Sequence, residues 1–166
     1  EKMALTAVQT YAQNGYTTIQ EGRADAGTSE MWRNLAQNGK LPIDLVVYPD
    51  ISTEKNYMLQ HGTNREYKHH YRIGGVKISL DGSPQGKTAW LTKPYVIQPE
   101  GQKKSYRGYA AFPQQSTVQN LIDLAFQNNW QILAHANGDA AIDQYLNTIE
   151  KATAKFPIQD RRNVII

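Results

Sequence analysis

Residues 131–146 read Gln-Ile-Leu-Ala-His-Ala-Asn-Gly-Asp-Ala-Ala-Ile-Asp-Gln-Tyr-Leu, and this stretch decides the fold class. Its first part, 131–136, predicts a short, mostly apolar strand. A helix is expected to begin at Asp139, because apolar side chains then recur at helical spacing, at Ile142, Tyr145, Leu146 and Ile149. A strand that passes almost directly into a helix is the building unit of α/β proteins.

The same alternation extends outward over the rest of the chain. Helices are expected over 3–14 and 53–60, and in two segments for which Ser29 and Ser116 would be the N-caps. Further strands are expected over 16–20, 43–48, 75–80 and 164–166.

Strict alternation of helices and strands predicts a parallel sheet with right-handed crossovers. Two architectures satisfy this pattern, an open doubly wound sheet and part of a (β/α)8 barrel. A whole barrel needs about 250 residues. A chain of 166 residues with five expected strands would be a little over half of one.

Composition excludes several classes of function. Lys and Arg total 18 against 15 Asp and Glu, a formal net charge of +3, and no basic cluster exceeds the Lys103-Lys104 pair with Arg107 nearby, so no nucleic-acid partner is expected. The absence of cysteine excludes a disulfide scaffold, thiolate metal sites and cysteine catalysis. Apolar runs are only a few residues long, so no membrane span is expected. The mean hydropathy of −0.62 fits a folded domain rather than a disordered chain.

The two ends of the chain favour an internal piece of a longer protein. The chain begins at Glu1 without an initiator Met or a secretory signal, and it stops in the β-branched run 164–166. The compartment therefore stays open. We expect one domain over 1–166 with a long loop insertion at about 82–115, where no period holds and four prolines occur.

Lys77 is a candidate functional residue, because it lies in the middle of the strand expected over 75–80. Alternation would place Val76, Ile78 and Leu80 on one face and Lys77 with Asp81 on the other. Burying an ammonium costs several kcal/mol unless it is paired or neutralised. Three interpretations remain open: a lysine paired with a carboxylate such as Asp81, a Schiff-base lysine, and a lysine carbamylated by carbon dioxide that bridges two metal ions.

His135 is the second candidate, at the C-terminal end of its strand, where sites in parallel α/β folds gather. It could be a hydrogen-bonded structural residue, a metal ligand or a general base. His69 and His70 are adjacent, would point apart, and lack the i, i+4 spacing of helical metal ligands, so no functional metal is expected there. No glycine-rich phosphate loop and no Gly-x-Ser-x-Gly elbow is present.

Two segments together resemble a known family. They are 75–83, Gly-Val-Lys-Ile-Ser-Leu-Asp-Gly-Ser, followed by Thr-Ala at 88–89 and Pro-Tyr at 94–95, and 134–143, Ala-His-Ala-Asn-Gly-Asp-Ala-Ala-Ile-Asp. They resemble the amidohydrolase superfamily, in the branch called amidohydrolase family 3, with its N-substituted formamide deformylase-like and exoenzyme-regulatory-like proteins. The resemblance covers most of the chain.

The resemblance implies a (β/α)8 barrel with metal at the C-terminal ends of the strands, of which this chain would span about strands two to six. Lys77 falls at the position of the carbamylated lysine, and His135 at a metal-binding histidine. The family's strand-one His-x-His, strand-six histidine and strand-eight aspartate have no match here. We therefore assign no residue of this chain as catalytic. We assign Lys77 and His135 as metal ligands.

The resemblance also implies a chemistry. The parent protein would hydrolyse an amide or another non-peptide carbon–nitrogen bond of a small molecule, with water activated by one or two divalent ions, zinc or a similar metal. Asp81, Ser83 and Asn137 would border the substrate pocket, although Pro-Gln-Gly-Lys at 84–87 departs from the Leu-Gly-Ser-Arg of many relatives.

The isolated piece is expected to be inactive, to bind few or no metal ions, and to self-associate through open strand edges. Two alternatives are a non-catalytic regulatory or binding barrel domain and a barrel enzyme with a Schiff-base lysine.

Overall fold

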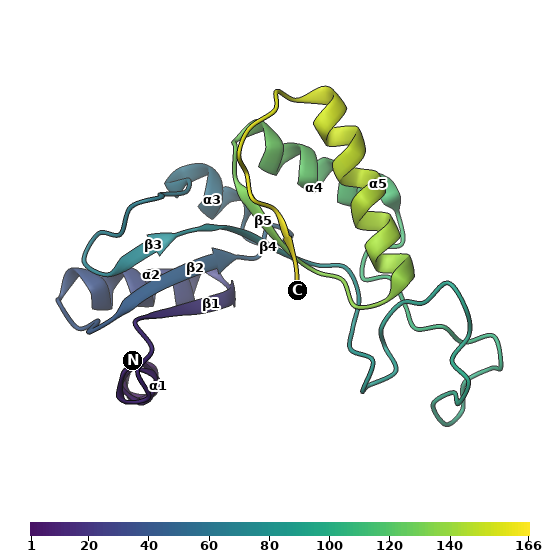
Figure 1. The fold of residues 1–166 in the computed structure, drawn as a ribbon, viewed down its shortest axis with the longest axis horizontal. Coiled ribbons are helices and arrows are strands. Elements are labelled where there is room, and N and C mark those ends of the chain that lie inside the picture. The colour runs from purple at the N-terminus through teal and green to yellow at the C-terminus, as the bar shows by residue number, and fades with distance from the viewer. The chain divides into compact units, whose positions relative to one another are not determined.

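The computed structural model describes all residues, 1–166, and the chain divides into two compact units, Glu1–Lys77 and Ile78–Ile166 (Figure 1). Helices and strands alternate as the sequence predicts, except that the strands Tyr71–Ile73 and Gly75–Ser79 follow one another without a helix between them. The strands form two three-stranded sheets rather than the single sheet expected. No helix has the length and apolar character that a membrane crossing requires.

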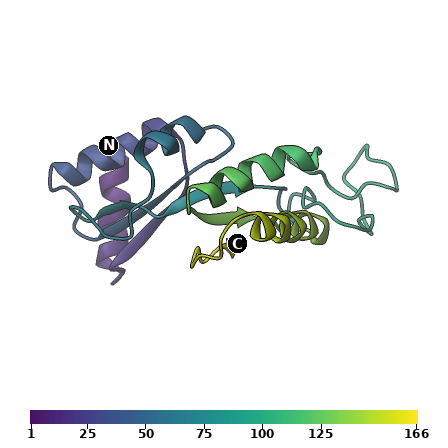
Figure 2. The same ribbon diagram turned by 90° about the horizontal axis from the view of Figure 1, so that it is seen from above.

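The first unit contains three parallel strands in the spatial order β1 (Thr18–Ala24), β2 (Asp44–Pro49) and β3 (Tyr71–Ile73). Leu45 of β2 lies opposite Ile19 of β1 and Tyr71 of β3. Helices α2 (Ala26–Gln37) and α3 (Lys55–His61) lie together over one face of this sheet (Figure 2). The elements in chain order are α1 (Lys2–Gln13), β1 (Thr18–Ala24), α2 (Ala26–Gln37), β2 (Asp44–Pro49), α3 (Lys55–His61) and β3 (Tyr71–Ile73).

The apolar run of β2 forms the centre of this sheet. Leu45, Val46 and Val47 are all buried, as expected for a parallel strand covered on both faces. Trp32 of α2 and Met58 of α3 are buried as well. Each large apolar side chain that is fully buried contributes about 1.5–3 kcal/mol relative to an exposed one.

Strand β4 (Gly75–Ser79) crosses the division between the units and belongs to the second sheet, in the order β4-β5-β6. The remaining elements are α4 (Gln115–Gln127), β5 (Gln131–His135), α5 (Asp139–Lys155) and β6 (Val164–Ile165). The pairing of β5 with β6 is parallel. Helices α4 and α5 lie side by side in both views (Figures 1 and 2). Gln115 Nε2 of α4 donates to Thr148 Oγ1 of α5 at 2.6 Å.

The segment 80–114, between β4 and α4, contains no helix or strand. Part of it folds back on itself. Leu91 N donates to Arg107 O at 2.8 Å, and Tyr95 N donates to Tyr106 O at 3.0 Å. The rings of Tyr95 and Tyr106 stack with their centroids 5.9 Å apart. This loop therefore has a defined conformation of its own.

Both predicted N-caps are wrong. The side chain that caps α2 is Asp25, which accepts from Thr28 N at 2.6 Å. Ser29 is buried inside the helix and donates to Asp25 O at 2.8 Å. Ser116 lies within α4, whose N-cap is Gln114 without a side-chain hydrogen bond. Asp25, Thr28 and Ser29 are all preferred N-cap residue types, so the sequence does not distinguish among them. Gln114 is not a preferred type, so the sequence favours Ser116 or Thr117 instead.

Strand β3 is an element that the sequence does not predict. It has three residues and follows a tight turn, in which Lys68 N donates to Tyr71 O at 2.9 Å and Tyr71 N to Lys68 O at 3.1 Å. Three residues show too little periodicity to indicate a strand. Residues 71–73 form a strand because they pair in parallel with β2.

Candidate functional site

Lys77 lies in β4 with only 5% of its surface exposed. A parallel bridge pairs it with Asp50, which follows β2 directly, and Ile51 N donates to Lys77 O at 2.9 Å. The carboxylate of Asp50 is engaged elsewhere, accepting from Arg23 Nε at 2.7 Å and from Ser52 Oγ at 2.6 Å. The ammonium of Lys77 therefore has no carboxylate within ion-pair distance.

The electrostatic surroundings shift the Lys77 amine toward its neutral form. Burial lowers the pKa of Lys77 from 10.5 to about 8, the charge of Arg23 lowers it as well, and Asp50 opposes the shift. In a fraction of the molecules, the Lys77 side chain is then a free amine near neutral pH. A free amine is nucleophilic, whereas an ammonium is not.

A small depression lies at the carboxyl ends of β1 and β2, the edge where parallel sheets bind ligands. Its volume is about 240 Å³, and it is lined by Arg23, Ala24, Asp25, Asp50 and Thr53. Asp50, whose charge acts on Lys77, thus faces this opening.

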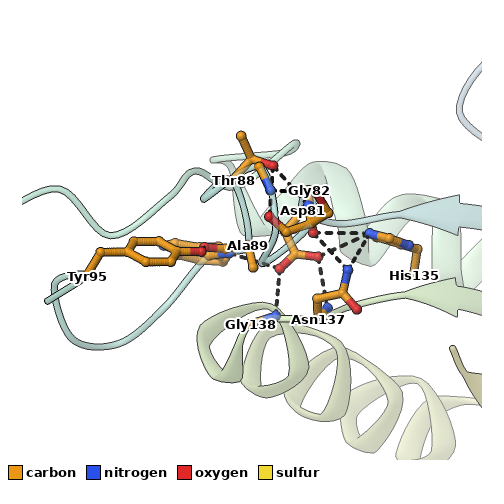
Figure 3. A network of polar contacts seen from close by, with 11 residues as sticks. Asp81, Gly82, Thr88, Ala89, Tyr95, His135, Asn137 and Gly138 are labelled. Atoms are coloured by element: carbon orange, nitrogen blue, oxygen red, sulfur yellow. Dashed lines mark hydrogen bonds and ion pairs between the residues drawn. The ribbon is translucent and has the colours of Figure 1, made fainter. Parts of the chain in front are cut away.

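In the second unit, His135 lies at the end of β5 (Figure 3). Its side chain is 31% exposed. Its Nε2 lies 3.2 Å from Gly82 O, 2.9 Å from Asn137 Nδ2 and 3.8 Å from Asp81 Oδ1. Its Nδ1 has no hydrogen-bond partner. The imidazole of His135 is therefore held through Nε2, and Nδ1 is the ring nitrogen without a hydrogen bond.

Asp81 is the centre of this network (Figure 3). Its side chain has no exposed surface. Oδ2 accepts from Gly138 N at 2.7 Å and Trp90 N at 2.9 Å, and Oδ1 accepts from Asn137 N at 3.0 Å. These bonds join the loop after β4 to the turn between β5 and α5.

Asn137 lies beside His135 and donates through Nδ2 to Gly82 O at 2.9 Å. Ser83 instead belongs to a tight turn, in which its backbone N donates to Thr88 Oγ1 at 2.9 Å and its Oγ accepts from Gly86 N at 3.2 Å. The structure thus brings Asp81, Asn137 and His135 into one network, while Ser83 shapes the adjoining loop.

Sequence reasoning missed two parts of this site. One is Gly138, where a Cβ atom would overlap the carbonyl group of Trp90, so only glycine allows this approach. The other is Thr92, whose N donates to Asp139 Oδ1 at 2.7 Å and whose Oγ1 donates to Asp139 Oδ2. Hydrogen bonds from the Thr92 side chain and backbone lower the pKa of Asp139. The Gly138-Asp139 pair at the start of a helix was the only available signal.

The five predicted site residues divide between the two units, Lys77 in the first and Asp81, Ser83, His135 and Asn137 in the second. No group of three or more His, Asp and Glu side chains is close enough together to hold a metal ion.

Comparison with known proteins gives relatives of one kind. The chain is 35% identical over 89 residues to the Bacillus subtilis (strain 168) protein named "Putative amidohydrolase YtcJ", a match over 54% of this chain and 16% of that protein. Its fold is similar to crystal structures of uncharacterized metal-dependent hydrolases from Pyrococcus furiosus and Pyrococcus horikoshii OT3, each with a TM-score of 0.74 and 21% identity.

The chain spans about a third of the length of these two structures. The match to the Pyrococcus furiosus structure covers 92% of this chain and 31% of that chain. The match to the Pyrococcus horikoshii structure covers 97% of this chain and 35% of that chain. The family model for the amidohydrolase family matches residues 1–166, the whole chain. This protein chain therefore belongs to the amidohydrolase family, in the branch called amidohydrolase family 3.

Proposed function

We propose that this chain is part of the barrel domain of a metal-dependent amidohydrolase that hydrolyses an amide or a related carbon–nitrogen bond of a small molecule. Two findings support this function beyond family membership: the similar folds of two metal-dependent hydrolases and the amidohydrolase name of the Bacillus subtilis relative. The observation that carries it is the buried Lys77 in a parallel strand, with its pKa lowered to about 8.

The side chains fit a divalent metal in part. The imidazole of His135 is partly exposed at a strand end, has one ring nitrogen without a hydrogen bond, and is a usual zinc ligand. An ammonium does not bind a cation, so Lys77 fits only as a carbamate. Its lowered pKa favours that reaction. The neutral Nζ attacks the carbon of carbon dioxide, an N–C bond forms, an electron pair of one C=O bond moves to oxygen, and the nitrogen releases one proton.

Carbamylated Lys77 and His135 would each be a metal ligand, and a bound metal would supply an activated water and polarise the scissile carbonyl. The remaining residues position these two. Asn137 and the Gly82 carbonyl limit the rotation of the His135 ring. Asp81 holds the main chain of Asn137 and Gly138, and through them the turn that follows His135.

Residues 1–166 alone would be inactive in this scheme. Catalytic zinc sites normally have at least three protein ligands, and this chain offers two candidates. Turnover of an amide substrate by purified 1–166, with contaminating enzymes excluded, would overturn this expectation.

Metal analysis tests the proposal on the protein expressed at its full natural length. After loading with zinc and bicarbonate, inductively coupled plasma mass spectrometry should find about one to two zinc ions per chain. Lys77→Ala and His135→Asn should reduce this content, and Lys40→Ala, at an exposed lysine, should not. Absence of bound metal in the unsubstituted protein would overturn the proposal.

The same lysine supports a second candidate function, a barrel enzyme that forms a Schiff base. A neutral Lys77 amine could attack the carbonyl carbon of a substrate and expel water to form an imine. Borohydride with a small aldehyde would then add mass to the peptide containing Lys77. In the hydrolase, ¹³C-bicarbonate would instead give a carbamate signal that Lys77→Ala removes.

A further inference from the structure

A cavity of about 400 Å³ lies in the first unit and shares no lining residue with the depression beside Asp50. Its walls come from the second half of α2, the end of α3, the turn before β3, and β3 itself. Five of its lining side chains carry basic groups: Arg33, His61, Lys68, His69 and Arg72. No aspartate or glutamate lines it.

Only one of the three permanent cations is neutralised. Arg33 pairs with Glu30, whose Oε2 lies 2.6 Å from Nη2, and the same carboxylate is 3.7 Å from His61 Nε2. Lys68 and Arg72 have no carboxylate within 4 Å. Two uncompensated positive charges therefore face a space without a counter-ion from the protein.

Arg72 also has an unused donor. Its guanidinium lies 5.0 Å from the centroid of the Tyr67 ring, and Nη1 reaches Asn64 O at 3.5 Å. Its Nε is buried and has no hydrogen-bond partner. A buried N–H without an acceptor costs about 1–3 kcal/mol, and in native proteins it commonly has a water or ion as its partner.

The turn before β3 places His69 at the cavity at some conformational cost. His69 and His70 have φ values of 53° and 64°, in the left-handed region that favours glycine. The hydrogen bonds between Lys68 and Tyr71 close this two-residue turn. His70 is held outside by Asp44, with 2.8 Å between Nδ1 and Oδ1, whereas His69 lines the cavity. Strained residues of this kind often mark functional sites.

We propose that this cavity binds the phosphate group of a small phosphorylated molecule. Two unpaired cations match a dianion better than a singly charged carboxylate, and guanidinium donors match phosphate oxygens in geometry. The cavity is much larger than a phosphate ion. Ala36, Tyr71 and Ile73 supply an apolar wall against which the organic part of the ligand would lie. This site does not depend on the hydrolase activity proposed above.

Isothermal titration calorimetry at constant ionic strength tests the proposal, using the protein at its full natural length. The probes are phenyl phosphate, inorganic phosphate and benzoate. Phenyl phosphate should bind at least tenfold more tightly than inorganic phosphate or benzoate. Equal affinity for inorganic and phenyl phosphate would overturn the organic part of the proposal, and tighter binding of benzoate would overturn the phosphate assignment.

Two variants locate the binding. Lys68→Met, at an exposed side chain, and Arg72→Gln should each weaken phenyl phosphate at least tenfold, while Lys40→Met, away from the cavity, should stay within twofold. Circular dichroism verifies that each variant is folded. Because Lys68 is exposed, that variant remains informative if Arg72→Gln does not fold. Unchanged affinity in a folded Lys68→Met variant would overturn the assignment to this cavity.

Discussion

The carboxylate of Asp81 accepts a hydrogen bond from the backbone N–H of Gly138 at 2.7 Å, although 57 residues separate them in the chain. The same carboxylate accepts from Trp90 and Asn137. One buried side chain thus joins the end of β4, the long loop and the turn after β5. The orientation of His135, two residues before Asn137, depends on this junction.

Replacing Asp81 by Asn should destabilise the second unit by about 2–4 kcal/mol. One carboxylate oxygen becomes an NH₂ group, which cannot accept, so at least one buried backbone N–H loses its partner. Hydrogen–deuterium exchange should show faster exchange in peptides that contain Trp90, Asn137 and Gly138. Asp143→Asn, at an exposed position on α5, is the matched control. Unchanged exchange in both variants would contradict the role assigned to Asp81.

Two glycines should respond in opposite directions to replacement by alanine. At Gly138 the new Cβ would overlap the Trp90 carbonyl, so Gly138→Ala should cost more than about 3 kcal/mol. At Gly27, inside α2, the nearest atom would be Asp25 Oδ1 at an ordinary 3.6 Å, and alanine should stabilise the helix by about 0.5–1 kcal/mol. Thermal unfolding measures both, and a stable Gly138→Ala variant would show that the contact is not tight.

Stability should rise with pH because of Lys77. Its pKa is about 8 in the folded state against 10.5 in the unfolded chain, so between these values the unfolded state binds the additional proton. The free energy of unfolding should then increase by up to about 3 kcal/mol as the pH rises from 8 to 10. Denaturant unfolding in metal-free, carbonate-free buffer measures this rise. Lys77→Met should remove it, and an equal rise in that variant would assign the effect to another group.

His69→Gly should separate stability from ligand binding. Glycine relieves the left-handed backbone at φ 53° and should raise stability by up to about 1 kcal/mol. Affinity for phenyl phosphate should fall, because an imidazole is lost from the cavity wall. His70→Gly relieves a similar strain but loses the contact with Asp44, so it should gain less stability and keep its affinity. Thermal unfolding and calorimetry measure the pair, and a destabilised His69→Gly variant would contradict the strain argument.

Local patterns in the sequence sufficed for the main elements. The apolar runs Leu45–Val47 and Ile132–Ala134 predict strands, because a short continuous apolar run suits a strand covered on both faces. Helices α1 and α5 follow from apolar spacing close to 3.6 residues. Alternation along β4 was also enough to mark Lys77 as an unusual residue, and the strand end marked His135.

The long-range contacts of the site could not be predicted, since they depend on groups distant in sequence. No local pattern indicates that Asp81 bonds to Trp90 and Gly138, that Asp50 rather than Asp81 is the acid acting on Lys77, or that β3 pairs with β2. Apart from β3, the local sequence alone was enough to determine which segments become helices and strands, because periodicity and apolar character are properties of neighbouring residues. Only the folded chain determined the long-range hydrogen-bond partners and the basic cavity, because these require segments separated by tens of residues to meet.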